Sequence, residues 1–239
     1  MEMKNYDNIR ISVIMPCRDE EGTVGSCVDE ARSFLEEYDP AGEVIVVDNC
    51  STDNSAALAL DHGARLIEES RIGYGYAIRC GLFEAAGSVI FIIDCDMTYD
   101  VADMENMLKL IDDGYDMVIG DRLSGVIEKG AMPLVHRIGV RILSKLAAAR
   151  FHVEVNDFHC GIRALSRAAL SKLDLKCGGM EFATEMIAEA SNAGLRIAQI
   201  PVRLRRCSAV RRSKLRVIRD GFRHLIYIIA GHIPGQDAN

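Results

Sequence analysis

The chain has 239 residues, of which 49% are hydrophobic, and its formal net charge is −7. This length supports one large domain or a domain with an appendage, and the composition provides ample material for a core. The negative charge argues against a general nucleic-acid-binding protein. The eight cysteines form no C-x-x-C pair, and residues 1–8 do not resemble a signal peptide. We therefore expect a reduced, cytoplasmic protein rather than a disulfide framework or a zinc site.

Short apolar runs alternate with segments of helical periodicity through the first half of the chain. The runs predict strands over residues 9–15, 43–47, 64–67, 89–93 and 117–119. The periodic segments predict helices over residues 21–38, 51–62, 75–86 and 101–113. This alternation indicates an α/β fold with a mainly parallel sheet covered by helices on both faces.

The second half of the chain is less regular. It predicts helices over 132–150, 166–173, 181–193 and 214–230, with strands over 161–165 and 197–200. We find no internal repeat, low-complexity tract or linker. We therefore expect one domain over residues 1–212, followed by a C-terminal helix and tail over residues 213–239.

The predicted C-terminal helix is amphipathic and basic. Residues 203–219 contain eight Lys or Arg and no Asp or Glu. One face of the helix carries Leu215, Ile218, Phe222, Leu225, Ile226 and Ile229, and its flank carries Arg212, Arg216, Arg219 and Arg223. This layout fits a helix lying on an anionic membrane surface, and it fits equally well a helix packed on the domain or in a homodimer interface. The longest apolar stretch there, residues 225–229, is far below the roughly 20 residues that a membrane span needs.

Asp94-Cys95-Asp96 follows the apolar run 89–93 directly. Ligands of open α/β sheets bind at the carboxyl ends of the strands, so both carboxylates are expected at a binding site. Hydroxyl groups follow at Thr98 and Tyr99. Mg2+ prefers one or two protein carboxylates together with phosphate oxygens and water. The pattern therefore favours a divalent cation that also holds phosphate, over solvated acids in a turn.

Polar residues also follow three other predicted strands, at residues 16–21, 48–51 and 120–122. Asp48 can accept hydrogen bonds from a base or a ribose, and Arg122 can meet a phosphate. Together the strand ends outline a site for a nucleotide diphosphate and a metal ion. The loop at residues 71–76 contains glycine but matches neither a Walker A motif nor a complete G-x-G-x-x-G, and a tight turn explains its glycines.

The ordered set of these motifs resembles an inverting family 2 glycosyltransferase with the GT-A fold, which has a Rossmann-like sheet. The segments that carry the resemblance are residues 13–20, 46–49, 71–81, 92–98 and 118–122. A further set is similar to the polyprenyl-phosphate branch of this family, which includes the dolichyl-phosphate mannosyltransferases. That set comprises residues 130–133, 136–137, 157–164, 179–182, 213–215 and 220–223, and the whole resemblance spans about residues 9–225.

The resemblance implies transfer of a sugar from a GDP- or UDP-sugar to a polyprenyl phosphate such as dolichyl or undecaprenyl phosphate. It implies a nucleotide site formed by Pro16, Arg18, Glu20, Val46, Asp48, Asp94 and Cys95. Asp94, Asp96 and Thr98 would hold Mg2+ or Mn2+. The acceptor phosphate would meet Arg122, Arg137, Arg141 and Lys214. The catalytic group would comprise Asp96, Arg122, Arg206 closing over the donor diphosphate, and Asp157 as the base for a hydroxyl acceptor.

Several positions depart from the family pattern, and alternatives remain open. Asn49, Arg18, Asp121 and Val140 replace common family residues. These changes leave the acceptor open between a lipid phosphate and a soluble peptide or metabolite. The alternative role of Asp157 is to cap the turn that holds residues 160–163.

Two other classes of protein fit less well. A sugar nucleotidyltransferase needs a glycine-rich loop after the first strand, where this chain has Pro16-Cys17-Arg18. A non-catalytic module that docks on membranes leaves Asp94 and Asp96 unexplained. We expect a cytoplasmic enzyme that is peripheral at the inner face of the membrane, and a homodimer is possible.

Overall fold

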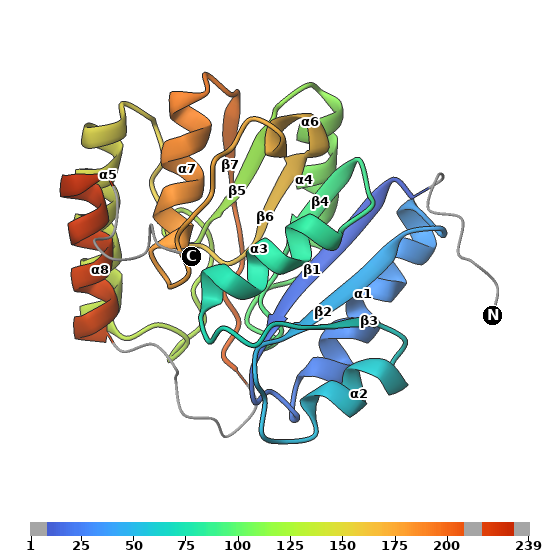
Figure 1. Cartoon of the computed structure of the whole chain (residues 1–239). Coiled ribbons are helices and arrows are strands. Elements are labelled where there is room, and N and C mark those ends of the chain that lie inside the picture. Colours follow the sequence, from blue (N-terminus) through green and yellow to red (C-terminus); the bar gives the residue numbers. More distant parts are fainter. Residues whose placement is uncertain (1–8, 208–216, 232–239) are drawn as a thin grey trace.

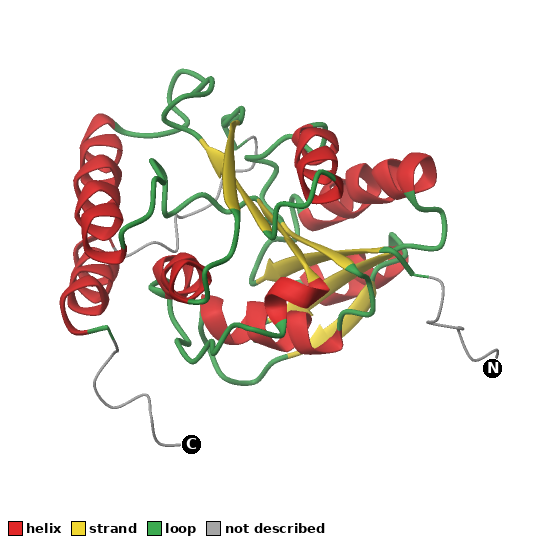
Figure 2. Ribbon diagram, turned by 90° about the horizontal axis from the view of Figure 1, so that it is seen from above, coloured by secondary structure: helices red, strands yellow, loops and turns green. Residues whose placement is uncertain are grey.

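The computed structural model describes residues 9–207 and 217–231, without the side chains of Val217 and Ile218. A seven-stranded sheet forms the centre of the molecule, in the order β3-β2-β1-β4-β6-β5-β7. Helices cover both faces of this sheet, and α5 and α8 lie together at one side of the molecule (Figures 1 and 2). The chain thus has the expected α/β architecture.

Each predicted element is present, with ends that differ from the expected ones by a few residues. The strands are β1 (Ile11–Cys17), β2 (Glu43–Asp48), β3 (Arg65–Glu68), β4 (Val89–Ile92), β5 (Met117–Asp121), β6 (Arg163–Ser166) and β7 (Ile197–Pro201). The helices are α1 (Val24–Tyr38), α2 (Ser55–Asp61), α3 (Tyr74–Glu84), α4 (Asp103–Asp112), α5 (Leu134–Phe151), α6 (Arg167–Leu170), α7 (Phe182–Asn192) and α8 (Val217–Ala230).

The sheet is parallel except for one strand. β1 pairs in parallel with β2 and β4, β2 with β3, and β5 with β7. β6 runs antiparallel between β4 and β5. Because β6 separates these two strands, the ends of β4 and β5 do not meet, and the expected convergence of all the polar strand ends is limited to β1, β2 and β4.

The central strands are buried because helices cover both of their faces. All six residues of β2 are buried, as are all four of β4, and both strands are dominated by branched apolar residues. Glu43 at the start of β2 is paired rather than exposed: it accepts a hydrogen bond from the Ser12 hydroxyl at 2.7 Å and from the Arg65 guanidinium at 3.0 Å. Such pairing offsets the cost of burying a carboxylate.

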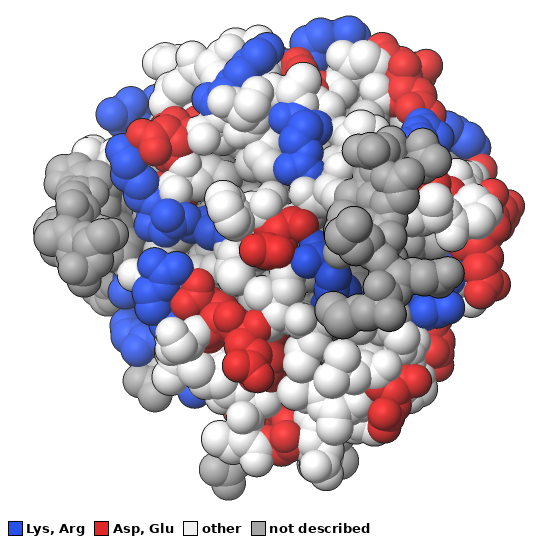
Figure 3. All heavy atoms as spheres, turned by 45° about the vertical axis from the view of Figure 1, so that its right-hand side comes forward, with Lys and Arg blue, Asp and Glu red and all other residues white. Residues whose placement is uncertain are grey.

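We find no helix within residues 9–207 and 217–231 that is both long and apolar enough to cross a membrane. The face drawn in Figure 3 carries basic and acidic side chains interspersed with each other.

Candidate functional site

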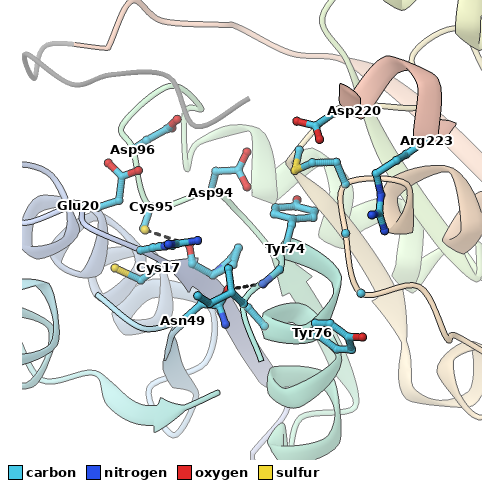
Figure 4. Close-up of a pocket in the computed structure, with 18 of the residues that line it drawn as sticks. Cys17, Glu20, Asn49, Tyr74, Tyr76, Asp94, Cys95, Asp96, Asp220 and Arg223 are labelled. Atoms are coloured by element: carbon cyan, nitrogen blue, oxygen red, sulfur yellow. Dashed lines mark hydrogen bonds between the residues drawn. The ribbon is translucent and has the colours of Figure 1, made fainter. Parts of the chain in front are cut away.

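A pocket of about 470 Å³ opens at the carboxyl ends of β1 and β4. Residues 16–18 and 94–96 line it from the ends of these two strands. Ile72 and Gly73 line it just before α3, and Tyr74, Tyr76 and Ala77 line it from the start of that helix. The opposite wall comes from residues 178–180 and from α8. Figure 4 shows Glu20, Asp94 and Asp96 toward one side, with Asp220 and Arg223 toward the other. The site therefore joins segments that lie far apart in the sequence.

The register of the sheet brings the two strand ends together. Ile14 of β1 pairs with Ile92 of β4, so Cys17 and Cys95 follow at matching positions. The Cys95 thiol donates to the Pro16 carbonyl oxygen at 3.1 Å. A hydrogen bond with Cys17 raises the pKa of Cys95, and burial raises it further. The Cys95 thiol is therefore protonated at neutral pH, and Cys17 and Cys95 both line the pocket.

Asp96 and Asp94 are the carboxylates expected to hold a metal ion. Asp96 Oδ1 accepts hydrogen bonds from the Thr98 backbone N at 3.0 Å and from the Thr98 hydroxyl. No cluster of three or more His, Cys, Asp or Glu side chains in the described part of the chain forms a complete metal site. Two carboxylates beside an open pocket suit an ion whose remaining ligands are phosphate oxygens and water.

Asp94 is held between a tyrosine and a glycine. Burial raises the pKa of Tyr74 well above its usual value, and the negative charge of the neighbouring Asp94 carboxylate raises it further. On the other side, a Cβ at Gly161 would lie 2.0 Å from Asp94 Oδ2, so only glycine fits there. The Gly161 backbone N is itself fixed, because it donates to the Tyr99 hydroxyl at 2.8 Å. Asp94 thus has a defined position at the pocket.

The other residues predicted to bind the nucleotide divide into two groups. Pro16, Arg18 and Glu20 line the pocket. Val46 is fully buried in the core and pairs with β1, so its side chain does not reach the pocket. Asp48 lies beside Cys17 in the sheet; its Oδ2 accepts from the Ser51 backbone N at 3.2 Å, and its buried Oδ1 has no hydrogen-bond partner.

Asn49 lines the pocket although it was not among the predicted site residues. Its Nδ2 donates to the carbonyl oxygens of Glu69 and Arg71, both at 2.9 Å. Its Oδ1 accepts from the Gly73 backbone N at 2.7 Å. The residue that departs from the family pattern after β2 therefore holds the glycine-containing loop against the end of β2. A Cβ at Gly73 would lie 2.1 Å from the Gly178 carbonyl oxygen, which gives this glycine a packing role.

Arg122 and Asp157, predicted to act separately on phosphate and on a proton, are paired with each other. Arg122 Nε donates to Asp157 Oδ2 at 2.7 Å, and its Nη2 donates to Asp157 Oδ1 at 2.8 Å. Both residues are buried, and neither lines the pocket. Burial alone would raise the pKa of Asp157, but the charge and hydrogen bonds of Arg122, together with His159, outweigh burial and lower this pKa. Asp157 Oδ1 also accepts from the His159 backbone N at 3.1 Å, which is the turn-capping arrangement.

The remaining predicted cations lie away from the pocket or outside the described residues. Arg206 is exposed, and its backbone N donates to Glu128 Oε2 at 2.9 Å. Arg141 is exposed on α5, whereas Arg137 Nε is buried on α5 without a hydrogen-bond partner. Lys214 lies outside the described residues. The pocket instead takes Arg219 and Arg223 from α8.

α8 presents its basic flank to the pocket and its apolar face outward. Arg223 forms a bidentate pair with the buried Glu181, at 2.6 Å and 2.5 Å. Burial alone would raise the pKa of Glu181, but the hydrogen bonds and charge of Arg223, together with backbone N–H groups, lower it overall. Arg219 keeps a side chain that is 62% exposed. Sequence segments 179–182 and 220–223 contributed to the resemblance, yet no local pattern showed that Glu181 and Arg223 would meet across 42 positions.

The comparisons with known proteins define the class of this chain. The family described as Glycosyl transferase family 2 matches residues 12–174, which is more than half of the chain. The chain therefore belongs to family 2 of the glycosyltransferases. This assignment confirms the resemblance and identifies the protein as an enzyme that transfers sugars.

Two relatives from Haloferax volcanii cover most of the chain. The low-salt glycan biosynthesis hexosyltransferase Agl6 is 35% identical over 94% of this chain. The chain spans only 54% of the length of Agl6. A dolichyl-phosphate hexose transferase is 31% identical, and the match covers 84% of this chain and 85% of that relative.

A similar solved structure is the glucosyl-3-phosphoglycerate synthase of Mycobacterium tuberculosis in complex with Mn2+, uridine diphosphate and phosphoglyceric acid. It matches with a TM-score of 0.73 at 21% identity, and the match covers 93% of this chain and 78% of the other. This likeness supports the GT-A fold.

Proposed function

We propose that the protein transfers a sugar from a nucleotide-diphosphate sugar to a polyprenyl phosphate, with inversion and with the help of Mg2+ or Mn2+. The observation that carries this proposal is the pocket itself: Asp94 and Asp96 stand at one wall, and Arg219 and Arg223 stand at the other. Carboxylates that bind a cation and arginines that bind phosphate are the groups that a diphosphate needs. The similarity to a dolichyl-phosphate hexose transferase supports the lipid acceptor.

Each wall of the pocket has a separate task in this proposal. Asp94 and Asp96 would hold the metal ion, which supplies positive charge to the diphosphate leaving group. The unpartnered Asp48 Oδ1 can accept a hydrogen bond from the nucleoside. The exposed guanidinium of Arg219 can bind phosphate oxygens, since the arginine fork matches phosphate geometry. Tyr74 and Gly161 keep Asp94 in place while the leaving group departs.

A phosphate acceptor agrees with the state of Asp157. An acceptor phosphate is already anionic at neutral pH, so its attack needs no strong general base. Asp157 is held in a bidentate pair with Arg122 and is fully buried, which keeps it from receiving a proton at the pocket. A hydroxyl acceptor would need a base, and a soluble acceptor remains the second candidate because the shared GT-A fold is compatible with both.

Donor binding tests the first half of the proposal. Calorimetry would measure binding of UDP-glucose and GDP-mannose with and without Mn2+ to the wild type and to Asp96→Asn. We expect metal-dependent binding of one donor and a loss of at least about tenfold in Asp96→Asn, because a ligand charge is removed. Asp113→Asn, an exposed acid at the end of α4, serves as the matched control and should bind like the wild type.

The choice of acceptor tests the second half of the proposal, namely that the sugar is transferred to a polyprenyl phosphate. The donor that binds would be supplied with radiolabelled sugar, together with either a polyprenyl phosphate in detergent or soluble phosphate compounds. Label recovered in the lipid fraction supports the proposal. Label recovered only in the soluble fraction would show that the acceptor is a soluble compound. Absence of donor binding to the folded protein would overturn the transferase site as described. We further propose a cytoplasmic location at the inner face of the membrane, reached by way of α8.

A further inference from the structure

α5 exposes a row of large apolar side chains to solvent. Leu134, Val135, Ile138, Ile142 and Leu146 are between 47% and 74% exposed. At 3.6 residues per turn these positions fall on one stripe about 120° wide. Only Ser144, Ala147 and Phe151 of this 18-residue helix are buried. The helix therefore turns most of its apolar surface away from the domain.

α8 carries a second exposed apolar stripe. Phe222 is 60% exposed, Ile226 41% and Ile229 70%, whereas Tyr227 and Ile228 on the opposite side are buried. α5 and α8 contact each other, and both lie at one side of the molecule (Figure 1). We name the eight exposed residues the α5/α8 face: Leu134, Val135, Ile138, Ile142, Leu146, Phe222, Ile226 and Ile229. Apolar clusters of this kind on a folded domain mark an interaction site.

The charge of α5 indicates the chemistry of the partner. The helix carries Arg137, Arg141, Lys145 and Arg150 and contains no Asp or Glu, on a chain whose net charge is −7. Arg141 and Lys145 are exposed and fall at the edge of the apolar stripe. Apolar residues bordered by Lys and Arg suit the boundary between acyl chains and anionic headgroups, where long basic side chains reach the phosphates.

A second copy of the chain is a poorer occupant of this face. The commonest dimers are twofold symmetric, so the same patch would meet itself. Arg141 and Lys145 of one copy would then approach the same cations of the other. The cores of protein interfaces are usually depleted of charge and rich in aromatic side chains, and Phe222 is the only aromatic residue of the α5/α8 face.

We infer that the α5/α8 face docks the protein on a membrane that contains anionic lipid, with α5 as the larger part of the contact. The inference extends the proposed function, on which its purpose rests. The two faces of α8 would then make different contacts: its outer residues meet the lipid, while Arg219 and Arg223 on its inner face line the donor pocket. A membrane-bound phosphate acceptor would be presented next to the pocket.

Vesicle flotation tests this inference without any acceptor lipid. The full chain would be mixed with vesicles of phosphatidylcholine alone or with phosphatidylglycerol added, and the bound fraction measured. We expect binding to the anionic vesicles that weakens as salt is raised. Ile138→Glu combined with Ile142→Glu should reduce binding by at least tenfold, because two exposed aliphatic groups that would enter the lipid become charged. Arg141→Gln combined with Lys145→Gln should reduce it roughly fivefold for each charge removed.

Matched controls separate docking from folding and from catalysis. Phe83→Glu alters another exposed apolar residue, 86% exposed on α3, and should bind vesicles like the wild type. Every variant should retain wild-type circular dichroism and metal-dependent donor binding. Wild-type donor binding without vesicle binding would overturn only the docking inference, whereas vesicle binding without donor binding would overturn only the transferase. Equal vesicle binding by the α5 variants, or a dimer that these variants dissociate, would also overturn the docking inference.

Discussion

Arg122 and Asp157 show how burial decides the role of a charged side chain. Both could act in catalysis when considered as separate sequence positions, yet the fold places them together with two hydrogen bonds at 2.7 Å and 2.8 Å. Removing one member of a buried pair leaves an uncompensated charge, which typically costs 3–5 kcal/mol. We therefore expect Asp157→Asn to lower the free energy of unfolding by about 3 kcal/mol in urea denaturation.

The same pair predicts a pH dependence whose sign follows from the lowered pKa of Asp157. A carboxylate with a folded pKa below its unfolded value stabilises the fold above the unfolded pKa, near 4, and loses this contribution as the pH falls through the folded pKa. Asp157→Asn should therefore destabilise the protein most at pH 7 and by progressively less as the pH falls below about 4. Lost activity with unchanged stability at pH 7 would instead point to Asp157 as a catalytic base.

Tyr74 offers a second prediction at the scale of one residue. Tyr74 lies beside Asp94, whose charge raises the pKa of the tyrosine. Tyr74→Phe should weaken metal-dependent donor binding by about tenfold in calorimetry, because Asp94 is then less well positioned. Tyr76→Phe is the control, because Tyr76 also lines the pocket but its ring packs under the Arg71 guanidinium. Equal losses in both variants would contradict the role assigned to Tyr74.

At the scale of the elements, the sequence was informative where local patterns decide structure. β2 and β4 could be predicted because helices on both faces of a parallel sheet require continuous apolar runs. Asp94 and Asp96 could be placed at the pocket for the same reason, since they follow such a run. Two other features could not be predicted from the sequence: the antiparallel direction of β6 and the pairing of Glu181 with Arg223. Both depend on contacts between segments that are distant in the chain.

The packing of α8 also depends on distant contacts, and one of them responds to pH. His224 is buried, hydrogen-bonds through Nδ1 to the Thr184 hydroxyl at 2.9 Å and stacks on His159 with ring centroids 4.2 Å apart. Burial lowers the pKa of His224 to about 4, although Glu181 and Asp220 nearby oppose this shift. Arg163 and Arg223 add to the lowering. The neutral imidazole is therefore the form that holds α8 against α7.

The sign of the resulting effect follows from the protons bound in each state. Between pH 6.5 and pH 4 the unfolded chain protonates this histidine and the folded chain does not, so stability falls as the pH is lowered through that window. A shift from 6.5 to about 4 corresponds to about 3 kcal/mol. Urea titrations of the wild type and of His224→Gln at pH 7 and pH 4.5 would measure this loss of unfolding free energy. A wild type and variant with the same pH dependence would contradict this role.

At the scale of the whole molecule, the pocket joins two parts of the chain that the sheet alone does not bring together. Residues 16–18 and 94–96 form one wall, and residues 178–180 form the other together with Arg219, Asp220 and Arg223. A donor bound between them would contact both parts at once. Its binding energy would therefore add to the stability of the complete fold rather than to one segment. Because a ligand that binds only the folded state raises stability through mass action, the effect is measurable as a change in melting temperature.

A donor at 100 times its dissociation constant should add about 2.7 kcal/mol, which for a chain of this size raises the melting temperature by about 5–10 °C. We expect this increase with UDP- or GDP-sugar only when Mn2+ is present, and we expect it to disappear in Asp96→Asn. Hydrogen exchange should slow in α8 as well as in residues 94–98, since Arg219 and Arg223 belong to the same pocket. Protection confined to the loop after β4 would mean that the donor rests on the carboxylate wall alone, and that α8 has no part in binding it.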